Sequence, residues 1–91
     1  MHTTNELLTA ALDRHNAAFW AREIGVKPNT FAMAKKRGRL SPTIAGALAR
    51  FIGEPVEHWI SVAALEAEPE SHEKTRLAKM VGARLESAVN R

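Results

Sequence analysis

The amino-acid sequence predicts an all-α fold, a compact bundle of five to six helices, and three observations support this. Apolar residues recur three and four positions apart, whereas β-branched residues never alternate over a useful length. Helix start and stop residues recur between these apolar stretches. Alanine is abundant and tyrosine is absent, which favours helices over strands. A chain of 91 residues fits one domain with a small core.

The first helix is predicted over residues 5–15. Thr3 and Glu6 have the spacing of a capping box, in which each side chain binds a backbone N–H near the other. An apolar stripe follows at the spacing of one helix face, and it consists of Leu7, Leu8, Ala11 and Leu12.

Three further helices are predicted over residues 17–24, 28–37 and 42–52. Each begins at a residue that favours a helix start, and these are Asn16, Pro28 and the pair Ser41-Pro42. Each ends at a glycine, because the residue after a helix often adopts a left-handed conformation. These glycines are Gly25, Gly38 and Gly53. The buried face of the third of these helices is expected to consist of Ile44, Ala45, Leu48 and Ile52.

Two more helices are predicted after Gly53. The fifth opens at Pro55, and apolar residues cover most of its circumference, so it is expected to be buried on more than one side. Pro69 ends this pattern, and Ser71 can cap a sixth helix from His72 to about Val89. Its apolar stripe consists of Leu77, Met80, Val81, Leu85, Ala88 and Val89. The only hinge we expect is the connection over residues 67–70.

Charge is distributed unevenly along the chain. Residues 16–42 contain six basic residues and one acidic residue, whereas residues 43–70 contain one basic and five acidic residues. A basic block of this kind is typical of a surface that faces a polyanion. The alternative is a chance cluster of solvated lysines and arginines.

Several classes of function are not expected from this composition. Cysteine is absent, which excludes disulfides, thiol catalysis and cysteine-ligated metals. The histidines are far apart in sequence, and no serine, histidine and acid fall on one predicted face. We therefore expect no enzyme, cofactor, metal or small-molecule ligand. No apolar stretch approaches the roughly 18 residues of a membrane span, and no signal region opens the chain, so a cytoplasmic protein is expected.

The second and third helices have the spacing of a DNA-binding helix-turn-helix. They are separated by Gly25-Val26-Lys27, a turn of the required length. Ala21 is small where the two helices must cross closely, and Gly25 stands where the chain needs a positive φ. The space between these two helices and the rest of the domain is expected to be filled by Trp20, Ile24, Val26, Phe31 and Ala34.

The run from Trp20 to Phe31 resembles the helix-turn-helix of phage repressors and Cro-like regulators. That family often reads Leu-Ala-x-x-Leu-Gly-Val-Ser, then three variable residues and a Val. Gly38 and Pro42 resemble the glycine after its recognition helix and the proline that opens its next helix. The resemblance covers about residues 5–52 and implies a lambda-repressor-like fold and a small phage or prophage regulator. Residues 59–68 resemble small proteins of filamentous-type phages.

Three residues depart from the family pattern. Lys27 replaces the usual serine before the recognition helix, so the N-cap hydrogen bond is lost. Ala34 replaces a frequent aromatic residue near the end of that helix. Phe19 stands where the family usually exposes a polar residue, so it either packs under a neighbouring helix or contributes to an interface.

The resemblance implies a set of DNA-contacting residues. Matching positions that face the major groove are Lys27, Pro28, Asn29, Ala32, Met33 and Lys36. An asparagine such as Asn29 can pair with adenine, Ala32 and Met33 can contact thymine methyl groups, and a lysine can reach guanine. Phosphate contacts, which fix register without reading sequence, are expected from Asn16, Lys35, Arg37 and Arg39.

A single recognition helix reads too few base pairs to select a genomic site, so a homodimer on a palindromic operator of double-stranded DNA is expected. We divide the chain into residues 1–53, the helix-turn-helix core, and residues 54–91, which complete the core and dimerise. Interface residues are expected to be Trp59, Leu77, Met80, Val81, Leu85 and Val89. The alternative for the sixth helix is that it folds back on its own core.

The function that this sequence favours is a transcriptional regulator, a repressor that acts by occupying operator DNA. One alternative is a protein-interaction module, an antitoxin or an inhibitor of a host defence complex, with an autoregulatory helix-turn-helix. Exposure of Phe19 or Trp59 would favour it, because surface aromatic residues mark protein interfaces. Another alternative is an excision factor that bends DNA.

Overall fold

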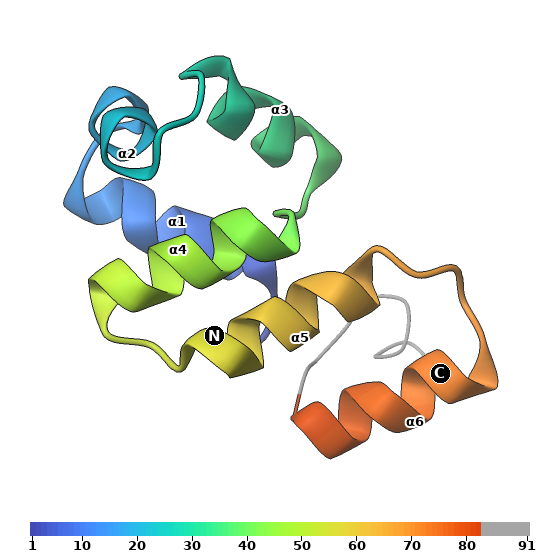
Figure 1. The fold of residues 1–91 in the computed structure, drawn as a ribbon. Helices are drawn as coiled ribbons and strands as arrows, with labels where there is room; N and C mark the ends of the chain where they lie inside the picture. Colours follow the sequence, from blue (N-terminus) through green and yellow to red (C-terminus); the bar gives the residue numbers. More distant parts are fainter. Residues whose placement is uncertain (83–91) are drawn as a thin grey trace.

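The computed structural model describes residues 1–82, which form six α-helices and no strand. The helices are α1 (Thr4–Arg14), α2 (Ala17–Ile24), α3 (Asn29–Arg37), α4 (Pro42–Ile52), α5 (Val56–Glu66) and α6 (His72–Val81). Figure 1 shows α2 and α3 at one end of the molecule and α6 at the other, with α1, α4 and α5 between them. The predicted all-α class is confirmed for this part of the chain.

Local signals determine where the first four helices begin and end. The Thr3–Glu6 capping box is present, and the Asn16 side chain accepts a hydrogen bond from the Phe19 backbone N–H at 2.9 Å. Gly25 has a φ of 85°, a left-handed conformation that glycine adopts without a steric penalty. Gly38 and Gly53 end the next two helices in the same conformation. The predicted boundaries of these helices are confirmed to within one residue.

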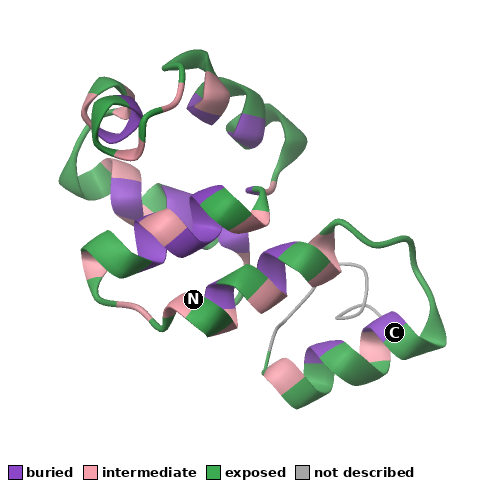
Figure 2. Cartoon of the chain, viewed as in Figure 1, coloured by how far each residue is buried: buried purple, intermediate pink, exposed green. Residues whose placement is uncertain are grey.

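The core lies where α1, α4 and α5 meet and extends under α2 and α3. Its largest fully buried side chains include Trp20, Phe31, Leu7, Leu40, Leu48 and Trp59. Figure 2 shows that the buried residues of α1 and α4 are concentrated in the middle of the molecule. Of the predicted buried face of α4, Ile44, Ala45 and Leu48 are buried, and Ile52 is half-buried. The α2 and α3 pair is therefore attached to a continuous apolar support.

Helices α4 and α5 make the most extensive contact of the fold, and Gly46 allows their close approach. A Cβ at this position would lie 2.8 Å from Cγ1 of Ile60 and 3.6 Å from Cγ1 of Val56. These separations leave little room for a side chain at Gly46. The glycine is thus required by packing, whereas Gly25 is required by backbone conformation.

Helix α5 is buried on more than one side, as its sequence predicts. Trp59, Val62 and Ala63 are buried in the core, and α6 covers another side of the helix. The indole N–H of Trp59 donates to the Glu54 carboxylate at 3.1 Å. Coverage by α1, α4 and α6 leaves Ile60 as the large apolar side chain of α5 that is exposed, at 39%. The apolar circumference of α5 is therefore largely satisfied within one chain.

Helix α6 is shorter than predicted. It ends at Val81, and Gly82 takes a φ of 80° and closes the helix through its backbone N–H. The prediction of a continuous helix to Val89 is wrong, because a glycine in the left-handed conformation terminates α6. Leu85, Ala88 and Val89 lie outside the described residues.

Candidate nucleic-acid interface

The connection between α2 and α3 is built on the carbonyl oxygen of Ala21. The backbone N–H groups of Gly25 and Val26 both donate to it, at 2.8 and 2.9 Å. The Ala21 side chain is 3% exposed, so the position predicted to be small is buried. Trp20, Phe31 and Ala34 are also buried, and Ile24 and Val26 are half-buried against the core. The five residues expected to fill the space around the two helices therefore do so.

Helix α3 begins without a side-chain cap. Pro28 occupies the N-cap position with helical φ and ψ of −56° and −35°, and no side chain accepts a hydrogen bond there. The backbone closes the first turn instead, because the N–H groups of Thr30 and Phe31 donate to the carbonyl oxygens of Lys27 and Pro28. The cap that the sequence lacks at Lys27 is therefore absent from the structure as well.

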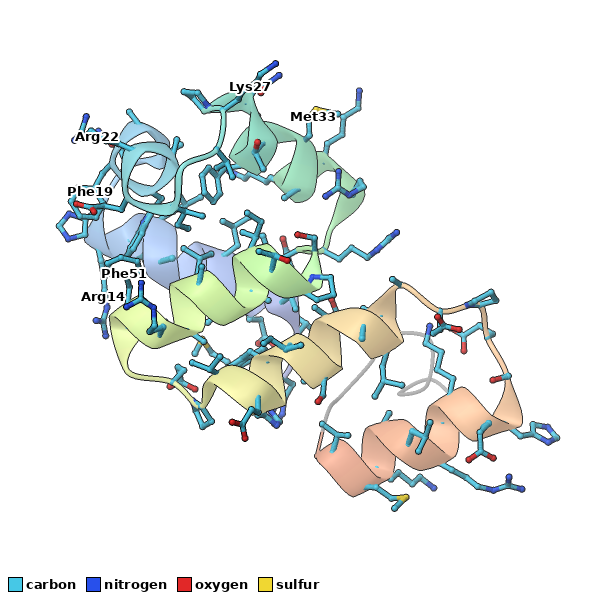
Figure 3. All side chains as sticks on the ribbon, in the orientation of Figure 1. Arg14, Phe19, Arg22, Lys27, Met33 and Phe51 are labelled. Atoms are coloured by element: carbon cyan, nitrogen blue, oxygen red, sulfur yellow. The ribbon has the colours of Figure 1, made fainter. Side chains whose placement is uncertain are left out.

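Helix α3 has one buried face and one exposed face. Phe31 and Ala34 are 2% and 1% exposed and hold the helix against the core. The positions predicted to face the major groove are all exposed, and they are Lys27, Pro28, Asn29, Ala32, Met33 and Lys36. Because they lie three or four residues apart, four of them share one helix face, and these are Asn29, Ala32, Met33 and Lys36. Figure 3 shows Lys27 and Met33 directed away from the bundle at the α3 end of the molecule.

The exposed face of α3 is basic. Lys35 and Arg37 are exposed and Arg39 is half-buried, all near the C-terminal end of the helix. Cations near a helix C-terminus are favoured by the helix dipole, so local stability explains part of this placement. Within residues 1–82 the ion pairs lie in the C-terminal part, so the basic side chains between residues 22 and 39 are not neutralised by an acidic partner. This surface can therefore attract a polyanion.

Asn16 lies at the start of α2 and is exposed. Its side-chain oxygen is occupied by the N-cap hydrogen bond to the backbone N–H of Phe19. The side-chain amide nitrogen remains as the donor, so a phosphate contact from Asn16 requires no change in the cap.

Phe19 packs within the chain and is half-exposed. Its ring stacks on His15 at 3.7 Å between centroids, and it meets Trp20 edge to face at 5.1 Å. Trp20 in turn meets Phe51 at 5.7 Å, and the Arg50 guanidinium lies 4.8 Å from the centre of the Phe51 ring. Phe51 is 41% exposed. Figure 3 shows Phe19, Phe51 and Arg14 on one side of the molecule.

We name this surface the aromatic patch, and it consists of His15, Phe19, Arg50 and Phe51. Sequence reasoning singled out Phe19 but missed Phe51, because the C-terminal turn of α4 meets the start of α2 only in the folded chain. The available signal was Phe51 itself, a large aromatic residue seven positions after Ile44 and therefore at the edge of the predicted apolar face.

The residues expected to dimerise fall into three groups. Trp59 is 1% exposed and packs inside the protomer, so its side chain is not available at the surface. Leu77 and Met80 point outward on α6, at 39% and 80% exposure, whereas Val81 is half-buried against the core. Leu85 and Val89 lie outside the described residues. Of the predicted interface residues that the structure describes, Leu77, Met80 and part of Val81 are therefore accessible to a second chain.

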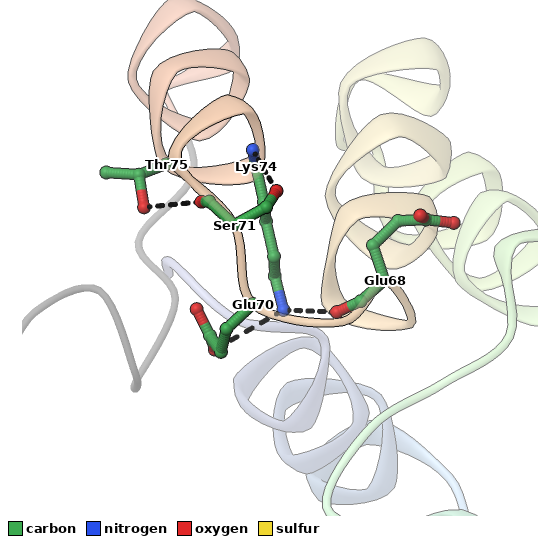
Figure 4. A network of polar contacts seen from close by, with 5 residues as sticks. All are labelled: Glu68, Glu70, Ser71, Lys74 and Thr75. Atoms are coloured by element: carbon green, nitrogen blue, oxygen red, sulfur yellow. Dashed lines mark hydrogen bonds and ion pairs between the residues drawn. The ribbon is translucent and has the colours of Figure 1, made fainter.

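Charged residues at the start of α6 are engaged within the chain. Nζ of Lys74 donates to the Glu68 carbonyl oxygen at 2.7 Å and lies 3.6 Å from the Glu70 carboxylate. Ser71 caps α6 beside them (Figure 4). Arg76 pairs with Glu73 at 2.8 Å. Lys74 therefore joins α6 to the connection over residues 67–70, which the sequence predicted as a hinge.

No protein-family model, curated protein or solved structure matches the chain. Among the described residues, no cluster of three histidine or acidic side chains has the arrangement of a metal site. None of the helices described here has the length and apolar character needed to cross a membrane.

Proposed function

We propose that this chain is a sequence-specific DNA-binding transcriptional regulator in which α2 and α3 act as a helix-turn-helix. The observation that carries the proposal is the division of α3 into two faces. Phe31 and Ala34 anchor the helix, and the exposed face carries Asn29, Met33 and Lys36 together with unpaired basic side chains. An exposed helix with a basic surface and groups that can bind base edges has the chemistry of major-groove recognition.

In the proposed complex, α3 enters the major groove. Asn29 binds an adenine edge, Met33 contacts a thymine methyl group, and Lys36 reaches a guanine or a phosphate. Lys35, Arg37, Arg39 and Asn16 bind the phosphate backbone and fix the register of the protein. The chain acts as a repressor of phage or prophage type by occupying its operator.

The proposed regulator binds a palindromic operator as a homodimer. Two copies of α3 then read half-sites about 34 Å apart, one turn of the double helix. Leu77 and Met80 of α6 supply the exposed apolar contact. Met80→Glu is expected to yield monomers in light scattering that still unfold cooperatively on heating, because Met80 is 80% exposed in the protomer. Glu57→Gln is the control, because Glu57 is also exposed on a neighbouring helix. An unchanged dimer in the Met80 variant would refute this interface, and a monomeric wild-type chain would refute the dimer.

A charge-matched pair of double variants tests DNA binding. A preferred duplex is first selected from a random-sequence pool with the wild-type chain, and affinity is then measured by fluorescence anisotropy at several salt concentrations. Lys35→Ala with Arg37→Ala is expected to weaken binding and to reduce the salt slope by about 0.9 for each phosphate that the variant no longer neutralises. Arg76→Ala with Lys79→Ala removes the same charge from α6 and is expected to leave affinity nearly unchanged. Equal effects of the two pairs would contradict the assignment.

Base reading is tested by single substitutions on the exposed face of α3. Asn29→Ala is expected to relax the preference at one base pair, at a cost of roughly 1–3 kcal/mol for a bidentate contact. Asn5→Ala is the control, because Asn5 is also exposed but lies on α1. Unaltered sequence preference in the Asn29 variant would remove this residue from the interface.

The aromatic patch favours a second candidate function, a protein-interaction module. Half-exposed aromatic rings beside an arginine are typical of the residues that dominate protein interfaces. Phe51→Ala is expected to abolish binding of a cellular protein that the wild-type chain and an Asn5→Ala control both retain in equal molar amounts. DNA affinity should be the same in all three chains. Retention of the same proteins by every chain would count against this function.

A further inference from the structure

Thr4 is a fully buried polar residue at the start of α1. Its side chain is 0% exposed, yet its hydroxyl and its backbone N–H are both hydrogen-bonded. The backbone N–H donates to Oε2 of Glu66 at 2.9 Å, and the hydroxyl donates to Oε1 of the same carboxylate. The hydroxyl oxygen also accepts a hydrogen bond from the Leu40 backbone N–H at 2.9 Å. This Glu66–Thr4–Leu40 chain joins three segments that are distant in sequence.

The chemistry of the Thr4 hydroxyl determines which group donates and which accepts in the Glu66–Thr4–Leu40 chain. A threonine hydroxyl has one proton, and the Glu66 carboxylate can only accept. The proton therefore points to Glu66, which leaves the oxygen lone pairs for the Leu40 N–H. Donation to a charged acceptor makes the hydroxyl oxygen a stronger acceptor in turn. A valine would fill the same volume but would leave the Leu40 N–H without a partner.

Leu40 is the residue at which the chain leaves α3 and returns to the core. The N–H groups of Gly38 and Arg39 donate to the Ala34 carbonyl oxygen and close the C-terminal turn of α3. One residue later, the Leu40 side chain is buried at 2% exposure and its N–H is bound by Thr4. Leu40 is therefore fixed to the core directly after the basic residues at the end of α3.

We infer that Thr4 and Glu66 are positioning residues that place the C-terminal end of α3, and with it Lys36, Arg37 and Arg39, for contact with DNA. This inference rests on the proposed function. The opposite end of α3 is held by other groups, because the turn at Gly25 and Val26 is bound to Ala21 of α2. Loss of the Glu66–Thr4–Leu40 chain should therefore displace Lys36 more than Asn29.

Substitutions at Thr4 separate this positioning role from general stability. Thr4→Val removes both hydroxyl bonds at constant volume, and Thr4→Ser keeps them. Affinity for the selected duplex is measured well below the melting temperature of every variant. Thr4→Val is expected to bind about tenfold more weakly, a factor equal to about 1.4 kcal/mol, and Thr4→Ser is expected to restore the affinity. Val62→Ala, a core variant of α5, is the control and should lower the melting temperature without this loss of affinity.

A double-mutant cycle identifies which end of α3 has moved. Thr4→Val combined with Lys36→Ala should lose less affinity than the two single effects together, whereas Thr4→Val combined with Asn29→Ala should be additive. Additivity with both partners, or wild-type affinity in Thr4→Val, would overturn the inference. Glu66→Gln, which keeps an acceptor but removes the charge, should give an intermediate loss.

Nuclear magnetic resonance tests the positioning without DNA. In Thr4→Val, the Leu40 amide should exchange faster with solvent, and the amide signals of residues 35–40 should shift while those of residues 29–32 stay. If the wild-type chain binds no duplex, the proposed function fails, and this measurement alone decides whether the Glu66–Thr4–Leu40 chain positions the end of α3. Unshifted signals for residues 35–40 would overturn it.

Discussion

Helices α5 and α6 are similar in length but attach to the molecule in different ways. Helix α5 buries Trp59, Val62 and Ala63 in the core shared with α1 and α4. Helix α6 packs mainly on α5, and its buried residues are Ala78 and Lys74. Burial of a large apolar side chain contributes roughly 1.5–3 kcal/mol, and an alanine contributes much less. An apolar pattern in sequence therefore does not reveal how much a helix contributes to the core.

This difference implies two levels of stability in one chain. Helices α1 to α5 share one cluster of buried side chains and should unfold together. Helix α6 is held by small residues and by the polar contacts of Lys74, so it should open locally before the rest unfolds.

The largest effect is expected from truncation. A chain that ends at Gly53 loses Trp59 and the rest of the α5 core face, so it should not fold. A chain that ends at Glu70 loses α6 and the residues after it, and should retain the helices before it. Circular dichroism on heating distinguishes the two chains, because only the longer one should show a cooperative transition. A cooperative transition in the shorter chain would show that α5 is dispensable.

Trp59→Ala should cause the largest loss among single substitutions, roughly 3–5 kcal/mol of unfolding free energy. Val81→Ala, at the half-buried end of α6, should cost less than about 1.5 kcal/mol because a smaller buried surface is removed. Urea unfolding measures both. Trp59→Phe serves as a control that keeps a buried ring but loses the bond to Glu54. Comparable losses in the two alanine variants would contradict a weakly attached α6.

Gly46→Val tests the α4–α5 contact. The added side chain would meet the Ile60 side chain at a distance that requires Ile60 or its helix to shift, and overpacking of this kind costs about 1–3 kcal/mol. Thermal unfolding should show the loss. The same substitution in combination with Ile60→Ala should be less harmful than in the wild-type background, because the space taken by Ile60 becomes free. If the losses of stability from the two substitutions were fully additive, contact with Ile60 would not be the cause of the strain.

Lys74→Met tests the attachment of α6. Methionine keeps much of the apolar stem but removes the hydrogen bond to the Glu68 carbonyl oxygen, at a cost of about 1 kcal/mol. The loss should appear as faster amide exchange in α6, with exchange in α4 and α5 unchanged. Lys79→Met, an exposed lysine on the same helix, is expected to change little. Global acceleration of exchange would mean that α6 belongs to the main cooperative unit.

The smallest expected effect is a dependence of stability on pH. It arises from Glu6 of α1, within the part of the chain formed by α1 to α5. Backbone N–H groups of His2 and Thr3 donate to the Glu6 carboxylate and lower its pKa below the ordinary value of 4.5. A carboxylate with a lowered pKa stabilises the folded state fully above pH 4.5, and this contribution disappears as the pH falls through the folded-state pKa. Wild type should therefore melt above Glu6→Gln at pH 7, and the two should converge in strong acid. If the melting temperatures of wild type and Glu6→Gln still differed in strong acid, the charge of Glu6 would not be the cause.

Much of the fold followed from residues a few positions apart. The Asn16 and Ser41 caps and the glycines after α2, α3 and α4 predicted these helix boundaries closely, because such hydrogen bonds close within one turn. The two faces of α3 were also predictable, since Phe31 and Ala34 share one face at helical spacing. In the candidate site, exposure of the six predicted base-facing positions agrees with this reading of the sequence.

Which of these helices support the others depends on contacts between residues that are far apart in sequence. Thr4 and Glu66 are separated by 62 positions, and nothing near either residue in sequence indicates their hydrogen bonds. Trp59 lies in the protomer core, although its apolar helix fitted an interface between chains equally well. The physical reason is that helix ends depend on contacts within a turn, whereas burial depends on which surfaces meet when the whole chain closes its core.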